Sequence, residues 1–428
     1  MARGEGRWGE RVTVAARLGD SFIGVNYGQV ADNLPPPATT VTLLKSTTIA
    51  KVRLYGADPV ILRALSGTGI GVVIGASNGE IPSLAADPAA ASQWIASNVL
   101  PFYPSTQIIL ISVGNEVFSS GDPNLPSQLL PAMQNLHSAL QSASIADKIK
   151  VSTVHSMAVL GQSDPPSSGA FQASLTDTMK PLLGFLQSTG SPFTINPYPY
   201  FAYRSDTRPE TLAFCRRHPI GAERRGSKDT EIVIAETGWP YNGDADEVGA
   251  TVENAKAYNG GLISHLRSMV GTPLMPGKSV DTYIFALYDE DLKPGPTSER
   301  SFGLFRPDGT VTYDVGLAKS SQAAAPAVGP PSSPSATKGP AGYCVPRPGV
   351  SDSQLQANLD YACGQGIDCT PIQPGGACYL PNTVASHAAY AMNLFYQKSE
   401  KKPLDCDFSK TAALIPGNPS KEFWTVFL

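Results

Sequence analysis

Two glutamates, Glu116 and Glu236, follow strand-like apolar runs and could act together in acid–base chemistry. In such a pair, one carboxylic acid protonates a leaving oxygen while the second carboxylate acts on the adjacent carbon, which is the chemistry of glycosidic-bond cleavage. Asn115, directly before Glu116, could bind a sugar 2-hydroxyl and strengthen that bond in the transition state. The alternative is a pair of ordinary surface carboxylates at strand ends, and two glutamates alone do not decide between these interpretations.

The elements that would position these glutamates are eight continuous apolar runs, which are typical of strands buried on both faces of a parallel sheet. Amphipathic segments such as residues 89–99 and 252–269 lie between several of them. Eight strands alternating with helices predict an α/β fold, a (β/α)8 or TIM barrel. A doubly wound open sheet is the alternative, but no Gly-rich phosphate loop follows the first run. The runs are residues 22–28, 51–56, 71–77, 108–116, 150–156, 193–200, 231–240 and 282–290.

Polar and aromatic side chains gather at the ends of these runs. In a barrel, the carboxyl ends of all eight strands converge on one face, where active sites lie. Glu116 would end the fourth strand and Glu236 the seventh, so the two carboxylates would face each other across a bound substrate. The strand-end groups are Asn26-Tyr27, Arg53-Tyr55, Asn115-Glu116, His155, residues 196–200, residues 236–239 and residues 288–290.

Five motifs resemble the family 17 glycoside hydrolases of plants, and the resemblance covers nearly all of residues 21–318. They are VGNE (113–116), GVNYGQVADNLPPP (24–37), INPYPYF (195–201), AETGWP (235–240) and SERSFGLF (298–305). The resemblance implies a retaining endo-glucanase that acts on 1,3-β-glucan or, in one branch, on mixed-linkage 1,3;1,4-β-glucan. It implies no cofactor and no metal.

The resemblance also implies roles for individual residues. Glu116 would be the general acid/base and Glu236 the nucleophile, with carboxyl groups about 5–5.5 Å apart and a covalent glycosyl-enzyme intermediate. Burial and the nearby Glu236 charge should raise the pKa of Glu116 so that it can act as an acid. Three residues would support the pair, unless they form only an ordinary surface ion-pair cluster: Glu290, Lys293 and Glu299. Independently of the resemblance, five aromatic residues at strand ends are predicted to bind sugar rings, with packing in the core as the alternative for each: Tyr27, Tyr55, Tyr198, Tyr200 and Trp239.

Five of the six cysteines crowd the last 85 residues, which indicates a disulfide-stapled module in an oxidising compartment. A zinc site is the alternative, but no C-x-x-C pair is present. The segment resembles the family 43 carbohydrate-binding modules, which implies a small, mainly helical module that binds 1,3-β-glucan without cleaving it. The resemblance implies the pairs Cys344–Cys406 and Cys363–Cys369. The predicted glucan-binding residues of this module are Tyr379, Asn382, Tyr390 and Tyr396, with helix packing as the alternative for any single one.

Composition divides the chain into four parts. Residues 1–20 form an atypical N-terminal segment, residues 21–318 the hydrolase domain, residues 319–341 a Pro/Ser/Ala-rich linker, and residues 342–428 the Cys-rich module. The linker has no apolar periodicity and cannot form a core. It would tether the module to the barrel and so raise the effective substrate concentration on an insoluble polymer.

Charge and hydropathy limit the partners. Only 16% of the residues are charged and the formal net charge is −4, so neither nucleic acid nor an anionic membrane is expected as the main partner. No run is long enough for a transmembrane helix, and residues 1–20 contain no recognisable signal peptide. The resemblance nevertheless implies an extracellular or cell-wall protein. We expect a monomer.

Two departures from the family pattern are visible. Residues 201–230 are short and basic, so the sixth helix of the barrel looks missing or degraded. The tail SKEFWTVFL replaces the segment that carries the sixth cysteine of the module, which leaves Cys378 without a partner in the family pattern. Two rival functions therefore stay open beside endo-hydrolysis: a non-hydrolytic glucan-binding wall protein, and a glucan transglycosylase in which a sugar replaces water.

Overall fold

The structure is a computed structural model that divides the chain into two compact units, Met1–Ala327 and Val328–Leu428. It describes residues 22–163, 169–207, 230–268, 271–272, 275–276, 279–319, 343–347, 350–365, 367–373, 379, 382–399 and 403–415. Each unit is considered by itself.

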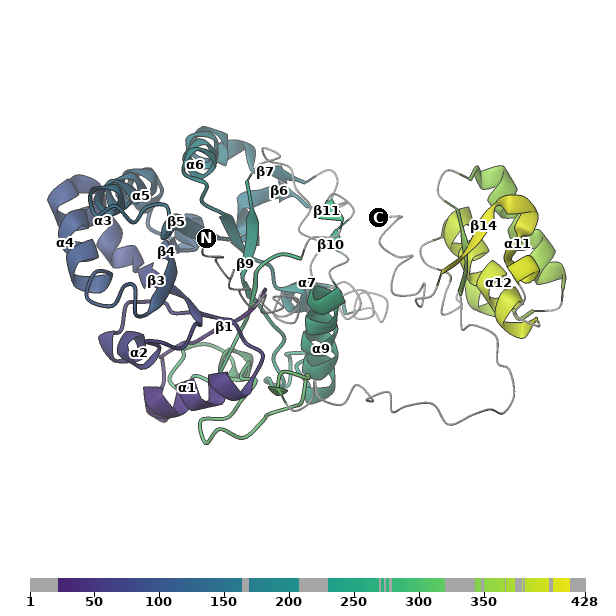
Figure 1. Cartoon of the computed structure of the whole chain (residues 1–428), viewed down its shortest axis with the longest axis horizontal. Coiled ribbons are helices and arrows are strands. Elements are labelled where there is room, and N and C mark those ends of the chain that lie inside the picture. Colours follow the sequence, from purple (N-terminus) through teal and green to yellow (C-terminus); the bar gives the residue numbers. More distant parts are fainter. Residues whose placement is uncertain are drawn as a thin grey trace, which may run out of the picture. The chain divides into compact units, whose positions relative to one another are not determined.

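Eight parallel strands of the first unit close into a barrel (Figure 1), in the order β1-β12-β9-β8-β5-β4-β3-β2. Each of the eight apolar runs contains one barrel strand, so the predicted barrel is confirmed. Most strands end earlier than the runs do, because the polar residues at the run ends leave the sheet. The strands are β1 (Ile23–Asn26), β2 (Lys51–Arg53), β3 (Gly71–Ala76), β4 (Gln107–Asn115), β5 (Lys150–Ser156), β8 (Phe193–Asn196), β9 (Ile232–Thr237) and β12 (Thr282–Ile284).

Helices flank the outside of this barrel (Figure 1). Helix α5 shows why these helices pack as they do: Leu129, Leu136 and Leu140 lie on one face and are fully buried. It packs against α3 and α4. The side chain of Asp58 caps α2 by accepting from two backbone amides of its first turn. The helices are α1 (Pro37–Ser46), α2 (Pro59–Ala64), α3 (Ile81–Ala86), α4 (Pro88–Asn98), α5 (Leu125–Ser142), α6 (Thr176–Thr189), α7 (Pro199–Ser205) and α9 (Val252–Ser268).

The predicted loss of the sixth helix falls mainly on residues 208–229, which lie outside the described residues. The described part of that segment begins with the short helix α7. Two further two-stranded sheets, β6 (Leu160–Gln162) with β7 (Ala170–Phe171) and β10 (Gly271–Thr272) with β11 (Met275–Pro276), are separate from the barrel.

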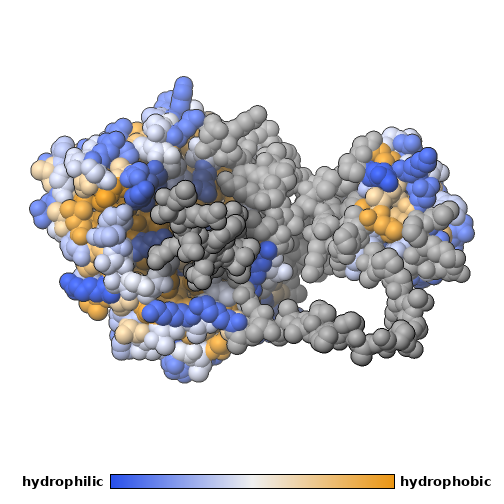
Figure 2. Space-filling view, viewed as in Figure 1, coloured by the Kyte–Doolittle hydropathy of each residue, from blue (hydrophilic) through white to orange (hydrophobic). Residues whose placement is uncertain are grey.

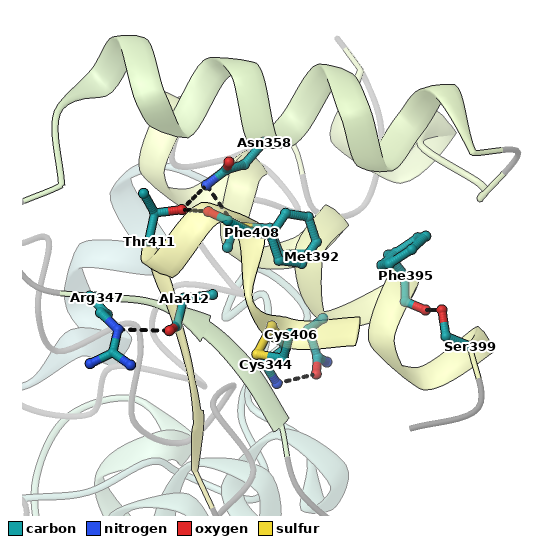
Figure 3. The surroundings of a disulfide bond; sticks show 11 residues. Cys344, Arg347, Asn358, Met392, Phe395, Ser399, Cys406, Phe408, Thr411 and Ala412 are labelled. Carbon is teal, nitrogen blue, oxygen red and sulfur yellow. Dashed lines mark hydrogen bonds between the residues drawn. A yellow bond between two sulfur atoms is a disulfide. The ribbon is translucent and has the colours of Figure 1, made fainter. Parts of the chain in front are cut away.

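The described part of the second unit contains the α-helices α11 (Asp352–Gly364) and α12 (Val384–Lys398) and an antiparallel pair, β13 (Tyr343–Pro346) with β14 (Ala412–Ile415). Its disulfides join Cys344 to Cys406 and Cys363 to Cys369. Cys344 belongs to β13, and its bond to Cys406 is drawn in Figure 3. The amide of Cys344 donates to Asn393 Oδ1 at 3.1 Å. Cys215, Cys378 and the altered tail lie outside the described residues.

Polar and apolar areas alternate on the face of the molecule shown in Figure 2. Large apolar side chains are exposed one by one, such as Val60 at 57% and Leu292 at 57%, which is normal for a protein in water. Within the described parts of the chain, no helix has the length and apolar character needed to cross a membrane.

Candidate active site

Glu236 lies in β9 at the carboxyl end of the barrel, and its buried carboxylate accepts hydrogen bonds from three side chains. Arg53 Nη1 donates to Oε1 at 2.6 Å and Tyr55 Oη donates to the same oxygen at 2.8 Å. Tyr198 Oη donates to Oε2 at 2.9 Å. Three donors, one of them charged, stabilise the ionised form of the carboxylate and hold it in one orientation.

Arg53 contacts several residues of this site, and its side chain is only 3% exposed. Besides Glu236, its guanidinium donates to Asn115 Oδ1 at 2.8 Å and lies over the ring of Tyr55, 4.6 Å from the centroid. Burial acts to lower the pKa of Arg53, but Tyr55 and the Glu236 carboxylate raise it overall. The guanidinium therefore stays charged and links the strand that carries Glu236 to the residue beside Glu116.

Glu116 follows β4 in a left-handed backbone conformation, with φ 51° and ψ 41°. A non-glycine residue in that region costs about 1–3 kcal/mol and persists only where its surroundings enforce it. Here the Glu116 amide donates to the Val154 carbonyl at 2.9 Å, and Asn196 Nδ2 donates to Oε1 at 2.8 Å. The strained turn directs the side chain away from the regular alternation of the strand.

The pKa of Glu116 is raised above the ordinary glutamate value, mainly because the carboxyl is partly buried. The charge of Glu236 raises it further, whereas the hydrogen bond from Asn196 and the charges of Arg53 and Lys293 act in the opposite direction. Two carboxyls thus sit in contrasting environments, one held by charged and neutral donors and one inclined to keep its proton. This division is what an acid–nucleophile pair requires.

Asn115 is held on both sides. Its backbone amide donates to Asn78 Oδ1 at 2.8 Å and its carbonyl accepts from Asn78 Nδ2 at 3.1 Å. Its side-chain oxygen is occupied by Arg53. The amide side of Asn115 is therefore oriented before any sugar arrives.

Tyr55 and Tyr198 are partly exposed and lie with Phe285 and Phe302 in one aromatic cluster. The pKa of each tyrosine is raised well above its ordinary value, first by burial and then by the Glu236 charge. Both hydroxyls therefore remain protonated donors. The structure brings these two predicted sugar-binding residues to the carboxylate of Glu236.

The other three predicted sugar platforms are contradicted by their burial. Tyr27 is 3% exposed, and Tyr200 and Trp239 are not exposed at all. The Trp239 ring packs against Tyr200 and Tyr258, and its Nε1 donates to the Gly249 carbonyl at 2.8 Å. These rings fill space behind the strand ends, so no face is available to stack on a sugar.

Glu290, Lys293 and Glu299 do not form one cluster. Glu290 is 5% exposed and accepts from the Val30 amide at 2.9 Å. A Cβ at Gly28 would come within 2.2 Å of its carboxyl, so a larger residue there would displace the Glu290 side chain. Lys293 pairs with Glu299 at 3.2 Å and lies over the Phe285 ring, 4.3 Å from the centroid. Glu290 therefore supports the loop after β1, which contains Val30. Lys293 and Glu299 stabilise the loop after β12 by pairing with each other.

Sequence reasoning named Arg53 and Asn196 only as polar groups at strand ends and gave them no role. The sequence feature that could have identified them is a charged or amide side chain within an apolar run. In the structure, Arg53 is 2% exposed and Asn196 is 3% exposed. A buried polar side chain must find a partner, which is Glu236 for Arg53 and Glu116 for Asn196. Among the described residues, no group of three or more His, Cys, Asp or Glu side chains could hold a metal ion.

The predicted glucan-binding residues of the second unit differ in their exposure and in their contacts. Tyr379 stacks on His387 with centroids 5.5 Å apart, Asn382 is exposed, and Tyr390 Oη donates to the Asp368 carbonyl at 3.3 Å. Tyr396 is fully buried in the core of the module, which contradicts its prediction as a binding residue.

Sequence reasoning missed an exposed ring on this unit. Tyr361 is 53% exposed and packs edge-on against Phe395 and Phe408, with centroids 5.7 and 6.1 Å away. An aromatic ring that is half exposed yet held by neighbours can present a face to a ligand.

A parallel eight-stranded barrel with paired glutamates at its carboxyl end defines a glycoside hydrolase, and comparison with known proteins gives the same class. The family model of Glycosyl hydrolases family 17 matches residues 23–218 and 220–317. The chain belongs to this family. The X8 domain model matches residues 342–413.

Similar proteins span both parts of the chain. The sequence is 62% identical to glucan endo-1,3-beta-glucosidase 7 of Arabidopsis thaliana, over 94% of this chain and 83% of the relative. It is 57% identical to glucan endo-1,3-beta-D-glucosidase of Olea europaea, over 94% and 92%. Among solved structures, CJP38, a beta-1,3-glucanase and allergen of Cryptomeria japonica pollen, is 40% identical with a TM-score of 0.66, over 69% of this chain and 99% of that one.

Proposed function

We propose that this protein is a retaining endo-hydrolase of 1,3-β-D-glucosidic linkages in β-glucans such as callose. The observation that carries the proposal is the contrast between the two glutamates: three donors hold the carboxylate of Glu236, while the pKa of Glu116 is raised. The relatives named glucan endo-1,3-beta-glucosidase supply the substrate class.

In the first step, Glu116 gives its proton to the glycosidic oxygen as the bond to the anomeric carbon breaks. A Glu236 oxygen attacks that carbon from the opposite side and forms a covalent glycosyl-enzyme ester. In the second step, Glu116, now a carboxylate, takes a proton from water, and the resulting hydroxyl displaces Glu236. Two inversions at the same carbon retain its configuration.

Other residues act on the sugar or on the pair. The oriented amide of Asn115 would donate to the 2-hydroxyl of the reacting glucose, and Tyr55 and Tyr198 would place their hydroxyls beside Glu236 as its charge is consumed. Lys293, with Glu299, would contribute positive charge near the acid, and Glu290 would fix the loop above β1. No step requires a metal or cofactor.

The second unit would bind the same polymer and keep the barrel close to it. We assign this role to the exposed Asn382 and Tyr361 and to the half-buried Tyr379 and Tyr390. We further propose that the module is mainly helical and that residues 319–341 link it to the barrel. The protein would act as a monomer, outside the cell or in the cell wall. The alternative, a protein that only binds glucan, is not favoured, because Glu236 and Glu116 both keep their hydrogen-bond partners.

The test is hydrolysis of linear 1,3-β-glucan by the wild type and by Glu236→Gln. We expect the variant to lose activity by at least about 10³-fold, because the amide is not a nucleophile. Glu231→Gln, an exposed glutamate at the other end of the same segment, is the matched control and should retain activity.

Two measurements on the products complete the test. Nuclear magnetic resonance of the first products should show the β-anomer, whereas the α-anomer would contradict retention. Products longer than the substrate would instead favour the transglycosylase. A folded wild type that binds the glucan and releases no reducing ends would refute hydrolysis.

A further inference from the structure

Glu247 is a buried carboxylate of the barrel unit that has no part in the mechanism above. It lies in the loop between β9 and α9, and its side chain has no exposure to solvent. Four donors meet it: the amide and hydroxyl of Ser298, the amide of Asp244 at 3.0 Å, and Arg204 Nη1 at 3.2 Å. The Ser298 amide donates at 2.9 Å.

A carboxylate without solvent is retained only where its charge is fully compensated. Burial acts to raise the pKa of Glu247, but the bonds from Ser298 and Asp244 and the charge of Arg204 lower it overall. The group therefore stays ionised. Each oxygen accepts two hydrogen bonds, which leaves little freedom for the three chain segments that provide the donors.

These three segments follow three different barrel strands. Arg204 belongs to α7 after β8, Asp244 to the loop after β9, and Ser298 to the short 3₁₀ helix η7 (Thr297–Arg300) after β12. Asp244 adds a second link, since its carboxylate accepts from the amide of Thr297 at 3.1 Å and from the hydroxyl of that residue. Two carboxylates thus hold together segments that share no strand pairing with one another.

The loop held in this way carries Lys293 and Glu299. Ser298 directly precedes Glu299, which pairs with Lys293 at 3.2 Å. Arg300 Nη1 closes the loop by donating to the carbonyls of Lys293 and Gly295, both at 2.9 Å. The loop is internally cross-linked, so a displacement at Ser298 would move Lys293 as well.

The ammonium group of Lys293 rests on the Phe285 ring, whose centroid lies 6.2 Å from that of Tyr198. Tyr198 in turn donates to Glu236. A contiguous set of contacts therefore runs from Glu247 to the catalytic pair.

We propose that Glu247 is a positioning residue that holds the Lys293–Glu299 loop at the barrel mouth. The proposal rests on the proposed hydrolase function. It concerns a residue that belongs to none of the five sequence motifs. Glu247 touches no reacting atom and acts through Ser298.

The experiment is the pH dependence of kcat/KM on a soluble laminari-oligosaccharide for the wild type, Glu247→Gln, Lys293→Met and the double variant. The alkaline limb reports loss of the proton from Glu116, whose charged neighbours are Glu236, Arg53 and Lys293. Because Lys293 acts to lower the pKa of Glu116, moving it away shifts the limb to higher pH. We expect Glu247→Gln and Lys293→Met each to produce that shift, with roughly tenfold lower kcat/KM.

The direction of the shift separates positioning from direct electrostatics. Removing the negative charge of Glu247 by itself would lower the pKa of Glu116 and move the limb the other way. If Glu247 acts through the loop, then Glu247→Gln should add no further shift in the Lys293→Met background. An upward shift that vanishes in that background supports the proposal, and a downward or absent shift in a folded variant overturns it.

Two more variants serve as controls. Asp246→Asn removes an exposed carboxylate next to Glu247 and should leave the profile unchanged. If Glu247→Gln does not fold, as judged by thermal melting, Ser298→Ala decides, because it removes one donor and keeps the backbone. A smaller upward shift then supports the proposal, and an unchanged limb overturns it. The wild-type activity in the same series tests the hydrolase function independently.

Discussion

At the scale of single residues, the site works because two identical side chains are placed in unlike surroundings. Glu236 receives a guanidinium and two phenols, so its negative charge is met on both oxygens. Glu116 is partly buried, which favours its protonated form, and the single amide that it receives from Asn196 only partly opposes this effect. Neither environment follows from glutamate itself, and both depend on residues supplied by other strands.

The first prediction concerns Arg53, which is buried against Glu236. Arg53→Met should lower the free energy of unfolding by about 3–5 kcal/mol, because it leaves an uncompensated buried carboxylate, and should reduce kcat by roughly 10²-fold or more. Denaturant unfolding and steady-state kinetics measure the two effects. In a Glu236→Gln background the same substitution should be less destabilising, and an equal loss in both backgrounds would contradict the role of the ion pair.

The second prediction concerns Asn196, whose amide favours the ionised form of Glu116. Asn196→Ala removes that bond, so the pKa of Glu116 should rise further. A general acid works only while protonated, and the alkaline limb of the kcat/KM profile should therefore move to higher pH. The profile of Asn98→Ala, which removes an amide remote from the site, should match the wild type. A limb that moves to lower pH in Asn196→Ala would refute the assignment of Glu116 as the acid.

At the scale of elements, the strands were the predictable part. Each barrel strand is mostly buried, so a largely apolar run marks most of them, and β5 coincides with its predicted run over all of Lys150–Ser156. The nearness of Glu116 to Glu236 followed from the rule that strand ends converge. What escaped prediction depends on side-chain direction after the strands end: the left-handed turn at Glu116, the inward packing of Trp239 and the buried carboxylate of Glu247.

The third prediction concerns His155, in β5, which stacks on Phe193 with centroids 4.9 Å apart. Neither ring nitrogen has a hydrogen-bond partner among the described residues, and burial lowers the pKa of His155 to about 4. Between pH 6.5 and 4 the unfolded chain binds a proton there and the folded chain does not. Stability should therefore fall as the pH is lowered through this window, by about 3 kcal/mol.

Thermal melting against pH measures this loss in the wild type and in His155→Leu. The variant should lack most of the slope between pH 6.5 and 4, although His137 and His265, whose pKa values burial also lowers, remain in both proteins. Parallel curves for the two proteins would show that β5 does not contribute to the acid sensitivity of the barrel.

At the scale of the whole molecule, the two units have separate cores and separate means of stabilisation. The barrel is closed by strand pairing around an extended apolar core, whereas the second unit has a small core with two disulfides. A small unit buries too little apolar surface to be very stable alone, which is why cross-links are useful there. Such a unit can evolve a binding surface without affecting the geometry of the barrel.

The last prediction tests this division of labour on insoluble 1,3-β-glucan. Tyr361→Ala or Tyr379→Ala, made in the inactive Glu236→Gln background so that the polymer is not digested, should raise the Kd for the polymer by roughly tenfold, the loss of one aromatic contact of about 1–1.5 kcal/mol. Tyr361→Phe keeps the ring and should bind normally.

In the active background, the same alanine variants should keep their kcat/KM on soluble oligosaccharides and lose rate only on the polymer, because the tether matters only where the substrate cannot diffuse. Unchanged binding in both variants would remove these rings from the glucan-binding surface, and an equal loss on soluble substrate would mean that the second unit acts on the barrel rather than on the polymer.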